Sequence, residues 1–295
     1  MHRIEKYPLL MLILGVLGIS LSAIFVRLSD APSVVTATSR LLWTVVLMSP
    51  MTLGKRSYRK ELAGLSLQQW MKAVISGVFL AFHFALWFES LQQTSVASST
   101  AIVCTEVIWV ALGYRVFMKG KLSKKAVLSI VIAMAGSVII AFSDSGNETS
   151  HLYGDLLSAV SAMAIAVYIL LGKSLRVSMS ATVYTYLVYV ACSITLVILT
   201  AIQNYTVSDF TPSALIAGLL LGVFSTILGH SIFSWCLKYF SPAFVSASKL
   251  CEPVVAAILA AILFSEIPSV LQIIGGIIVI SGVYLYSKEE RKYKL

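Results

Sequence analysis

The chain has 295 residues, of which 58% are hydrophobic and only 12% are charged. Soluble domains carry about 25% charged residues, so this composition excludes an ordinary soluble protein and predicts a chain that crosses a membrane many times. The formal net charge of +9 comes from short clusters between apolar segments, without a basic face, which argues against nucleic-acid binding. The four cysteines lie in apolar segments at unrelated spacings, so we expect neither a disulfide framework nor a metal site.

The first apolar run extends from Pro8 to about Val26 and is too long for a signal-peptide core, so we interpret it as an uncleaved first span. Nine further apolar segments follow, separated by short polar or basic connections. The pattern predicts an all-α polytopic membrane protein with ten transmembrane helices. The nine later segments are centred near Val45, Leu80, Glu106, Ala133, Ala162, Ala191, Gly222, Val254 and Ile278.

Lysine and arginine residues gather at alternate connections between these segments. Cytoplasmic loops of membrane proteins carry an excess of such residues, so the pattern predicts a multi-pass protein of the cell membrane with both termini in the cytoplasm. The predicted cytoplasmic stretches are 3–6, 55–60, 115–125, 173–176, 238 and 288–294.

An internal repeat is detectable at an offset of 146 residues, and its most informative match relates Glu106 to Glu252. A carboxylate in the middle of an apolar span is rare, whereas the alanine and leucine matches carry little weight. The repeat divides the chain into residues 1–146 and 147–295. Each half holds five predicted spans, an odd number, so the second half must be inverted in the membrane. In secondary transporters such inverted repeats place the substrate site at the midplane.

The segment Ser241–Glu266 is long enough to span a bilayer, yet it carries Lys249 and Glu252 near its middle. Each charge costs about 2.5 to 3.5 kcal/mol at the centre of an isolated inserting helix, so such residues mark functional sites or buried ion pairs. Two interpretations are open. Glu106 and Glu252 could face a central cavity, or a buried ion pair with Lys249 could join two spans. Two carboxylates and one lysine leave one unbalanced negative charge, which suggests a bound proton.

Aromatic and histidine side chains could line a substrate path at the same depth. His83 and Trp87 share one face of the third span, and His230 lies in the eighth. Tyr168 and Trp235 could add aromatic walls. Each of these residues could equally be a packing residue bonded to a neighbouring backbone carbonyl.

Arg40 opens the second span, where it could extend toward the lipid headgroups or act as an outer gate or counter-ion. In the last span, Gly275, Val279 and Gly282 share one face, which predicts close packing against another helix.

We found no phosphate-binding loop, metalloprotease motif or nucleophile elbow in the sequence. We therefore do not expect an enzyme. A membrane-embedded enzyme remains an alternative in which Cys251 beside Glu252 would be the reactive pair, although neighbouring helix positions point about 100 degrees apart. A channel or a structural membrane protein is a second alternative.

Several motifs give the chain a resemblance to EamA-type transporters of the drug/metabolite transporter superfamily, over nearly its whole length. The resemblance implies ten helices in two inverted five-helix repeats, alternating access and no bound cofactor. It implies a central cavity formed by Glu106, His83, Trp87, Tyr168, His230, Lys249 and Glu252. The chain departs from the family pattern at two positions. Val107 stands where the family often has proline, and Lys249 stands where the family usually has a small or apolar residue. The motifs are Ser39 to Leu42, Ala85 to Trp87 with Thr94 to Ala101, Gly154 to Leu157, Cys251 to Val254 with Phe264 to Glu266, and Gly275 to Gly282.

These observations predict a secondary transporter of a small polar metabolite, and the resemblance implies an exporter with amino acids as the favoured substrate class. Lys249 and one of the two mid-span glutamates could bind the opposite ends of a zwitterion. The expected partners are the small-molecule substrate, protons and the lipid bilayer, while the oligomeric state is left open.

Overall fold

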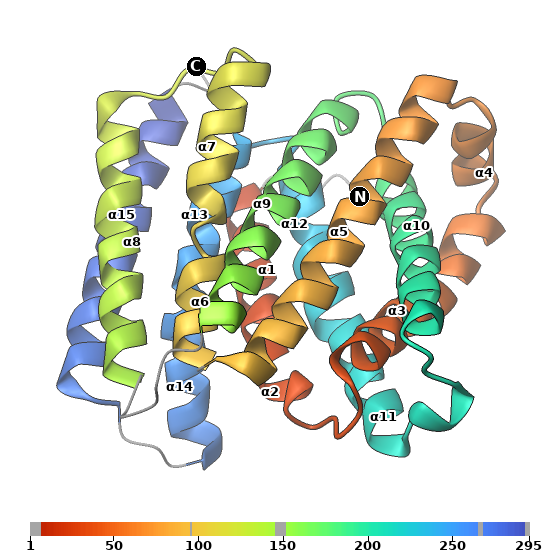
Figure 1. The fold of residues 1–295 in the computed structure, drawn as a ribbon. Helices are drawn as coiled ribbons and strands as arrows, with labels where there is room; N and C mark the ends of the chain where they lie inside the picture. Colours follow the sequence, from red (N-terminus) through yellow and green to blue (C-terminus); the bar gives the residue numbers. More distant parts are fainter. Residues whose placement is uncertain (1–6, 95, 145–151, 265–267, 293–295) are drawn as a thin grey trace.

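The computed structural model describes residues 7–94, 96–144, 152–264 and 268–292, and every regular element in these ranges is a helix (Figure 1). The first half contains α1 (Pro8–Ser20), α2 (Ser22–Val26), α3 (Ser33–Gly54), α4 (Arg56–Ala63), α5 (Leu67–Gln93), α6 (Val96–Val103), α7 (Glu106–Phe117) and α8 (Lys124–Asp144). The second half contains α9 (Leu152–Leu175), α10 (Ala181–Ile202), η2 (Val207–Asp209), α11 (Pro212–Leu220), η3 (Leu221–His230), α12 (Ser231–Cys236), α13 (Pro242–Ser248), η4 (Lys249–Cys251), α14 (Glu252–Phe264) and α15 (Val270–Lys292).

The predicted class, an all-α polytopic membrane protein, is confirmed, but the count of ten spans is not. Among the described residues, eight stretches are long and apolar enough to cross a membrane. The two other predicted spans coincide with α8, a helix of 21 residues, and with the segment from α13 to α14, which is broken into three pieces. The ten-span count therefore stays a prediction.

The segment that carries the charged pair is broken at its middle. α13 ends before Lys249, a short 3-10 turn follows, and α14 starts at Glu252. Pro253 has no N–H group and so cannot continue the helix by bonding to the Lys249 carbonyl. That carbonyl instead accepts a hydrogen bond from the Glu252 N–H, which closes the 3-10 turn.

The corresponding segment of the first half is broken in the same place although it lacks the proline. α6 ends at Val103 and α7 begins at Glu106, so both breaks are followed by a glutamate 146 residues apart. At this break the Thr105 hydroxyl donates to the Ile102 carbonyl at 2.7 Å, and such side-chain bonds compete with regular helix bonds. Val107 therefore does not restore a straight helix.

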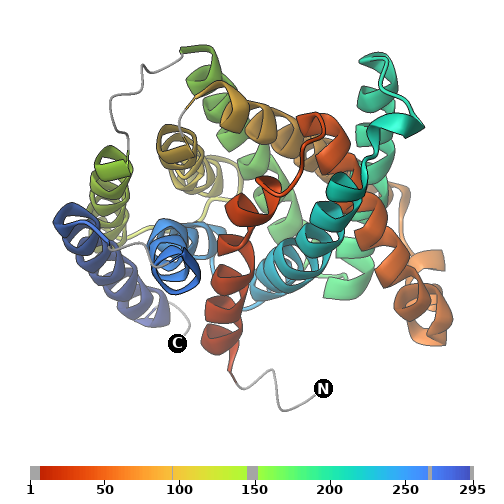
Figure 2. The same cartoon turned by 90° about the horizontal axis from the view of Figure 1, so that it is seen from below.

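The helices pair in a pattern that recurs in the two halves. α5 packs along α9, and α1 packs against η3; α7 contacts α9, and α1 contacts α14. α8 and α15, the last helices of the two halves, lie side by side at one edge of the bundle (Figures 1 and 2). When each helix is replaced by its counterpart in the other half, the α5–α9 contact becomes the η3–α1 contact and the α7–α9 contact becomes the α14–α1 contact. The α8–α15 contact is unchanged by this exchange.

Glycines allow α8 and α15 to approach closely. A Cβ atom on Gly136 would lie 2.6 Å from the carbonyl oxygen of Gly275, and one on Gly282 would lie 2.6 Å from the backbone nitrogen of Ala133. The packing role predicted for the small face of the last span is therefore confirmed.

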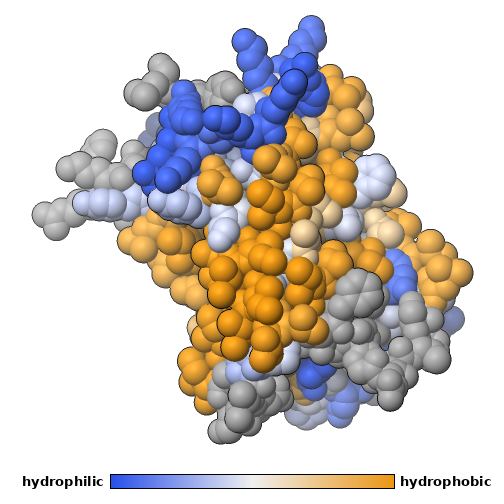
Figure 3. Space-filling view, turned by 90° about the vertical axis from the view of Figure 1, so that its left-hand side faces the viewer, coloured by the Kyte–Doolittle hydropathy of each residue, from blue (hydrophilic) through white to orange (hydrophobic). Residues whose placement is uncertain are grey.

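The outer face of the same two helices is apolar. Figure 3 shows an apolar band between a hydrophilic end at the top and polar residues at the bottom. Soluble monomers rarely leave apolar patches of this extent exposed, whereas lipid acyl chains would cover them. The exposed apolar residues include Val127, Leu128, Val131 and Val138 of α8 and Leu271, Ile274 and Ile277 of α15.

The eighth predicted span contains η3, a π-helix of ten residues. π-helical turns are rare and occur mostly at functional sites. The Thr226 hydroxyl donates to the Leu221 carbonyl, five residues earlier, at 3.2 Å, and the Ser231 hydroxyl donates to the Thr226 carbonyl at 3.2 Å. These bonds satisfy carbonyls within a helix whose regular pattern is altered, and they place Thr226 at the centre of the distortion.

Candidate functional site

A buried ion pair joins the breaks of the two interrupted segments. The Lys249 ammonium lies 2.9 Å from Oε1 of Glu106 and 3.2 Å from Oε2. The Ser246 hydroxyl donates to the same carboxylate at 2.7 Å. The two charged side chains are only 10% and 6% exposed, so each neutralises the other away from water. Lys249 is therefore the ion-pair partner of Glu106, and no ion pair between Lys249 and Glu252 is present among the described residues.

Glu252 faces a small cavity beside this pair. Among the described residues, no hydrogen-bond donor or cation lies within bonding distance of its carboxylate. The cavity has a volume of about 40 Å³, which holds a few water molecules but is far smaller than a metabolite pocket. Its lining residues come from both halves: Ile19, Ser22, His83, Trp87, Val103, Cys104, Glu106, His230, Lys249 and Glu252.

The two histidines stand together at one wall of the cavity, with ring centroids 6.5 Å apart. His83 Nδ1 lies 2.8 Å from the Ser161 hydroxyl and 3.2 Å from the Ser161 carbonyl. A carbonyl can only accept, so Nδ1 carries the proton and Nε2 is left as an acceptor. Trp87 stacks on His83 at 6.1 Å with an interplanar angle of 7°. His83 and Trp87 therefore lie together at the cavity wall, and their place in a substrate path stays a prediction.

The Tyr168 side chain packs beside His230. Its ring lies 6.2 Å from the His230 ring, and its hydroxyl is 2.8 Å from the Ser234 hydroxyl. Neither Tyr168 nor Trp235 is among the residues that line the central cavity, where the sequence placed both. Trp235 packs on Tyr239 with ring centroids 4.4 Å apart, and Tyr239 lines a different cavity at one end of the bundle.

Arg40 lies inside the protein, with 1% of its surface exposed, so its guanidinium does not extend to the lipid headgroups. Nε donates to the Thr226 hydroxyl of η3 at 2.7 Å, and Cζ sits 4.0 Å above the Phe84 ring. Nη1 and Nη2 are buried and have no hydrogen-bond partner among the described residues. The outer-surface position expected from the sequence is therefore replaced by a buried and only partly satisfied cation.

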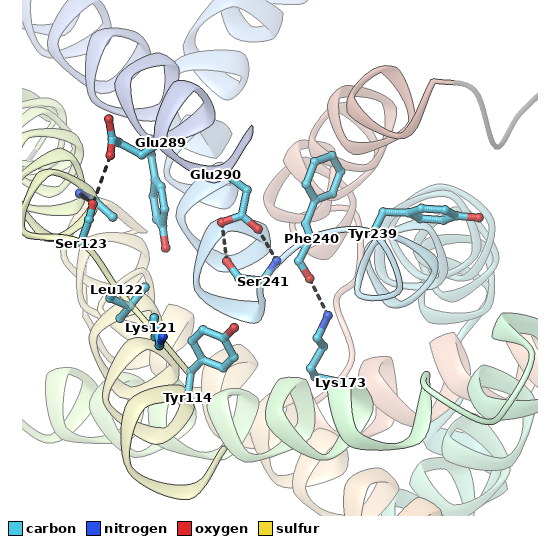
Figure 4. A pocket seen from close by; sticks show the side chains of 12 residues that line it. Tyr114, Lys121, Leu122, Ser123, Lys173, Tyr239, Phe240, Ser241, Glu289 and Glu290 are labelled. Carbon is cyan, nitrogen blue, oxygen red and sulfur yellow. Dashed lines mark hydrogen bonds between the residues drawn. The ribbon is translucent and has the colours of Figure 1, made fainter. Parts of the chain in front are cut away.

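A larger cavity of about 200 Å³ lies at the end of the bundle where α7, α9 and α15 finish (Figure 4). Here Lys173 of α9 donates to the carbonyls of Leu237 and Phe240, at 2.7 and 2.9 Å. Glu290 of α15 accepts from the N–H and from the hydroxyl of Ser241, the latter at 2.8 Å. Both side chains hold the turn 237–241 that connects α12 to α13. We call this arrangement the turn clamp.

Several residues of the central site have no signal in the sequence that could have identified them. Ser246 and Ser161 are ordinary small residues of apolar helices, and only their contacts with Glu106 and His83 give them a role. Thr226 matters because it lies in a π-helix, which apolar periodicity does not predict. Cys104 lines the cavity because a helix ends beside it.

No metal centre is evident in the part of the chain that the structure describes, because no three histidine, cysteine or acidic side chains converge there. The three cysteines Cys104, Cys192 and Cys236 are buried thiols, and Cys251 is partly exposed at the end of η4.

Comparisons with known proteins identify similar membrane transporters. The sequence profile of the EamA-like transporter family matches residues 6–142 and again residues 152–288. The chain is 24% identical to an uncharacterised transporter of Archaeoglobus fulgidus, over 84% of this chain and 86% of that protein. It is 23% identical to the uncharacterised transporter YxxF of Bacillus subtilis, over 95% of this chain and 88% of that protein.

One solved crystal structure covers 98% of this chain and 99% of its own, with a TM-score of 0.77 and 16% identity, which shows a shared fold. The family profile covers nearly the whole sequence in two consecutive matches. The chain therefore belongs to the EamA-like transporter family and is a multi-pass membrane transporter.

Proposed function

We propose that the protein is a secondary active transporter that exports a small polar metabolite, such as an amino acid, by alternating access across the cell membrane. The observation that carries this proposal is Glu252, a carboxylate at the first residue of a half-helix that has no hydrogen-bond or ion-pair partner among the described residues and faces a cavity lined by both halves of the chain. Discontinuous helices with polar groups at their breaks form the substrate sites of many secondary transporters.

The proposed architecture is the inverted repeat of residues 1–146 and 147–295, with ten spans. Three observations support it. Both interrupted segments restart at a glutamate, 146 residues apart, and the helix contacts are preserved when the halves are exchanged. The two matches of the family profile also divide the chain near residue 147.

Alternating access is supported by the size of the central cavity. At about 40 Å³ it admits no metabolite, so substrate binding requires the surrounding helices to move apart. The turn clamp holds the end of the bundle that carries Lys173 and Glu290. We assign this end, which is rich in lysine and arginine, to the cytoplasm together with both termini, so the cytoplasmic side is the closed side.

The charge balance bears on proton coupling. If Lys249 is the only cation counted, one of the two carboxylates has no balancing charge. The buried Arg40 adds a second positive charge, so the formal charges of the four side chains sum to zero; these are Arg40, Lys249, Glu106 and Glu252. In our proposal the positive charge of Arg40 balances the negative charge of Glu252 although the two side chains are not in contact. The Glu252 carboxylate then binds either a proton or the amine of a substrate, so protons and substrate compete for one carboxylate.

The test is flux into proteoliposomes that contain the purified protein and a mixture of labelled amino acids. We expect saturable uptake and counter-transport, with a pH dependence that Glu252→Gln removes. The matched control is Glu289→Gln, because Glu289 lies near the chain end and bonds Lys292 and Ser123. Transport by Glu252→Gln with an unaltered pH profile would rule out the role of this carboxylate.

Two other functions are distinguished by the same preparation. A channel would give flux that neither saturates nor supports counter-transport. An enzyme using the Cys251 thiol would lose its activity in Cys251→Ala, whereas we expect that variant to transport like the wild type, because Cys251 is not among the cavity-lining residues.

A further inference from the structure

We propose that the Arg40 guanidinium is the subsite for the carboxylate of the substrate, and that Lys249 is not. This inference rests on the proposed transport function and names the chemistry of the transported molecule. The substrate would be a zwitterion whose amine is bound by Glu252 and whose carboxylate is bound by Nη1 and Nη2 of Arg40.

Lys249 is already occupied. Its ammonium contacts both oxygens of the Glu106 carboxylate, at 2.9 and 3.2 Å, and its position over the Phe233 ring, 5.6 Å from the centroid, adds a further favourable contact. A substrate anion would have to displace a carboxylate that Ser246 also holds. Lys249 therefore offers little attraction to an incoming negative charge.

Arg40 also lies on an aromatic face, but unlike Lys249 it has no carboxylate partner among the described residues. It is 1% exposed, and two of its three guanidinium nitrogens have no partner among the described residues. Leaving such a charged group buried and unsatisfied costs several kcal/mol, by general estimates. The paired terminal nitrogens match the two oxygens of a carboxylate, which they can bind in a bidentate fork. An unsatisfied guanidinium in a transporter core is thus suited to an anion that is absent between transport cycles.

Phe84 contacts both Arg40 and a residue that lines the central cavity. Phe84 has its ring face 4.0 Å from Arg40 Cζ, and the same ring lies 5.3 Å from the ring of His230, which lines the cavity. Thr226, which holds Arg40 Nε, and His230 both belong to the π-helix η3. Movement of this one distorted segment would therefore shift His230 and the Arg40 contact together and bring the guanidinium into the cavity.

The experiment compares two classes of probe in proteoliposomes. The first is a mixture of leucine, phenylalanine, tyrosine and lysine; the second is the four amines that remain when their α-carboxylates are removed. For wild-type protein we expect saturable uptake that favours the amino acids. In Arg40→Met the ratio of amino-acid to amine uptake should fall about ten-fold or more, because a bidentate charged contact is lost. Arg40→Lys, which keeps the charge but not the fork, should give an intermediate ratio.

The matched control is Arg176→Met. Arg176 is also buried, at 5% exposed, but its nitrogens donate to the carbonyls of Ser234 and Met179, away from the cavity. Its removal should leave the uptake ratio unchanged. Equal loss of both probe classes in Arg40→Met, together with a wild-type ratio in Arg40→Lys, would overturn the inference and assign Arg40 to structure. Wild-type protein without saturable uptake of either class would overturn the proposed function itself.

Discussion

The Glu106 carboxylate and the Lys249 ammonium, 2.9 Å apart, join the start of α7 to the break between α13 and α14. This pair connects the two interrupted segments at the depth of the central cavity. It also distinguishes the two mid-span glutamates, because Glu106 has an ion-pair partner while Glu252 has none among the described residues.

Removing one member of this pair should destabilise the protein strongly. Glu106→Gln and Lys249→Met each leave one buried charge without its partner, which costs about 3 to 5 kcal/mol. The double variant removes both charges and should be more stable than either single variant. The measurement is the thermal unfolding midpoint in detergent for all four proteins. Single-variant losses that simply add in the double variant would contradict a direct pair.

The sequence predicted the membrane class, the charged segments and the shared helix face of His83 and Trp87, because each depends on the cost of polar groups in lipid or on helical periodicity. It could not predict which glutamate pairs with Lys249. Periodicity relates residues within one helix, whereas the Glu106 contact crosses between helices and depends on where both are broken.

The position of Arg40 shows a second limit of the sequence. An arginine seven residues into a helix of 22 residues can extend to the headgroups or turn inward. The choice depends on Thr226 and on the Phe84 face, which lie far away in the sequence. The π-helix that positions Thr226 leaves no mark in the apolar pattern, so both the burial and the unsatisfied nitrogens of Arg40 could be found only in three dimensions.

Breaking the turn clamp should open the protein at the end that carries it. Lys173→Met removes two charge-assisted hydrogen bonds to the turn 237–241, each worth about 1.5 to 3 kcal/mol, and Glu290→Gln weakens the bonds to Ser241. The reporter is Cys104, a cavity-lining thiol that is 6% exposed, in protein whose other three cysteines are replaced by serine.

We expect a membrane-impermeant maleimide applied at the side of the membrane that carries the turn clamp to label Cys104 about ten-fold faster or more in Lys173→Met than in the parent protein. Glu289→Gln is the control, because this neighbouring carboxylate bonds Ser123 and Lys292 instead of the turn. Unchanged labelling, or faster labelling from the opposite side only, would show that the clamp does not close this end.

The turn between α2 and α3 should lose stability at acid pH. Asp30 accepts hydrogen bonds from the hydroxyls of Ser213 and Thr211, the latter at 2.7 Å, and these bonds lower the pKa of the carboxyl below its usual range, the Ser213 bond most. A depressed folded-state pKa stabilises the protein above the unfolded value, about 3.9, and the contribution is lost as the pH falls through the folded value. Asp30→Asn should melt below wild type at pH 7 and match it near pH 3; an equal gap at both pH values would contradict the assignment.

Adding a methyl group at the α8 and α15 contact should destabilise the bundle. In Gly136→Ala the new Cβ would lie 2.6 Å from the carbonyl oxygen of Gly275, and backbone cannot move aside as a side chain can. Overpacking of this kind costs about 1 to 3 kcal/mol, and helix association in lipid depends on such close packing.

Gly276→Ala is the matched control, because its Cβ would meet only the Val254 side chain, at 3.4 Å. We expect the unfolding midpoint to fall in Gly136→Ala and to stay within a degree or two of wild type, about 0.5 kcal/mol, in Gly276→Ala. Equal midpoints for the two variants would mean that the two helices separate easily enough to absorb the methyl group, and the close contact would then not hold this edge of the bundle together.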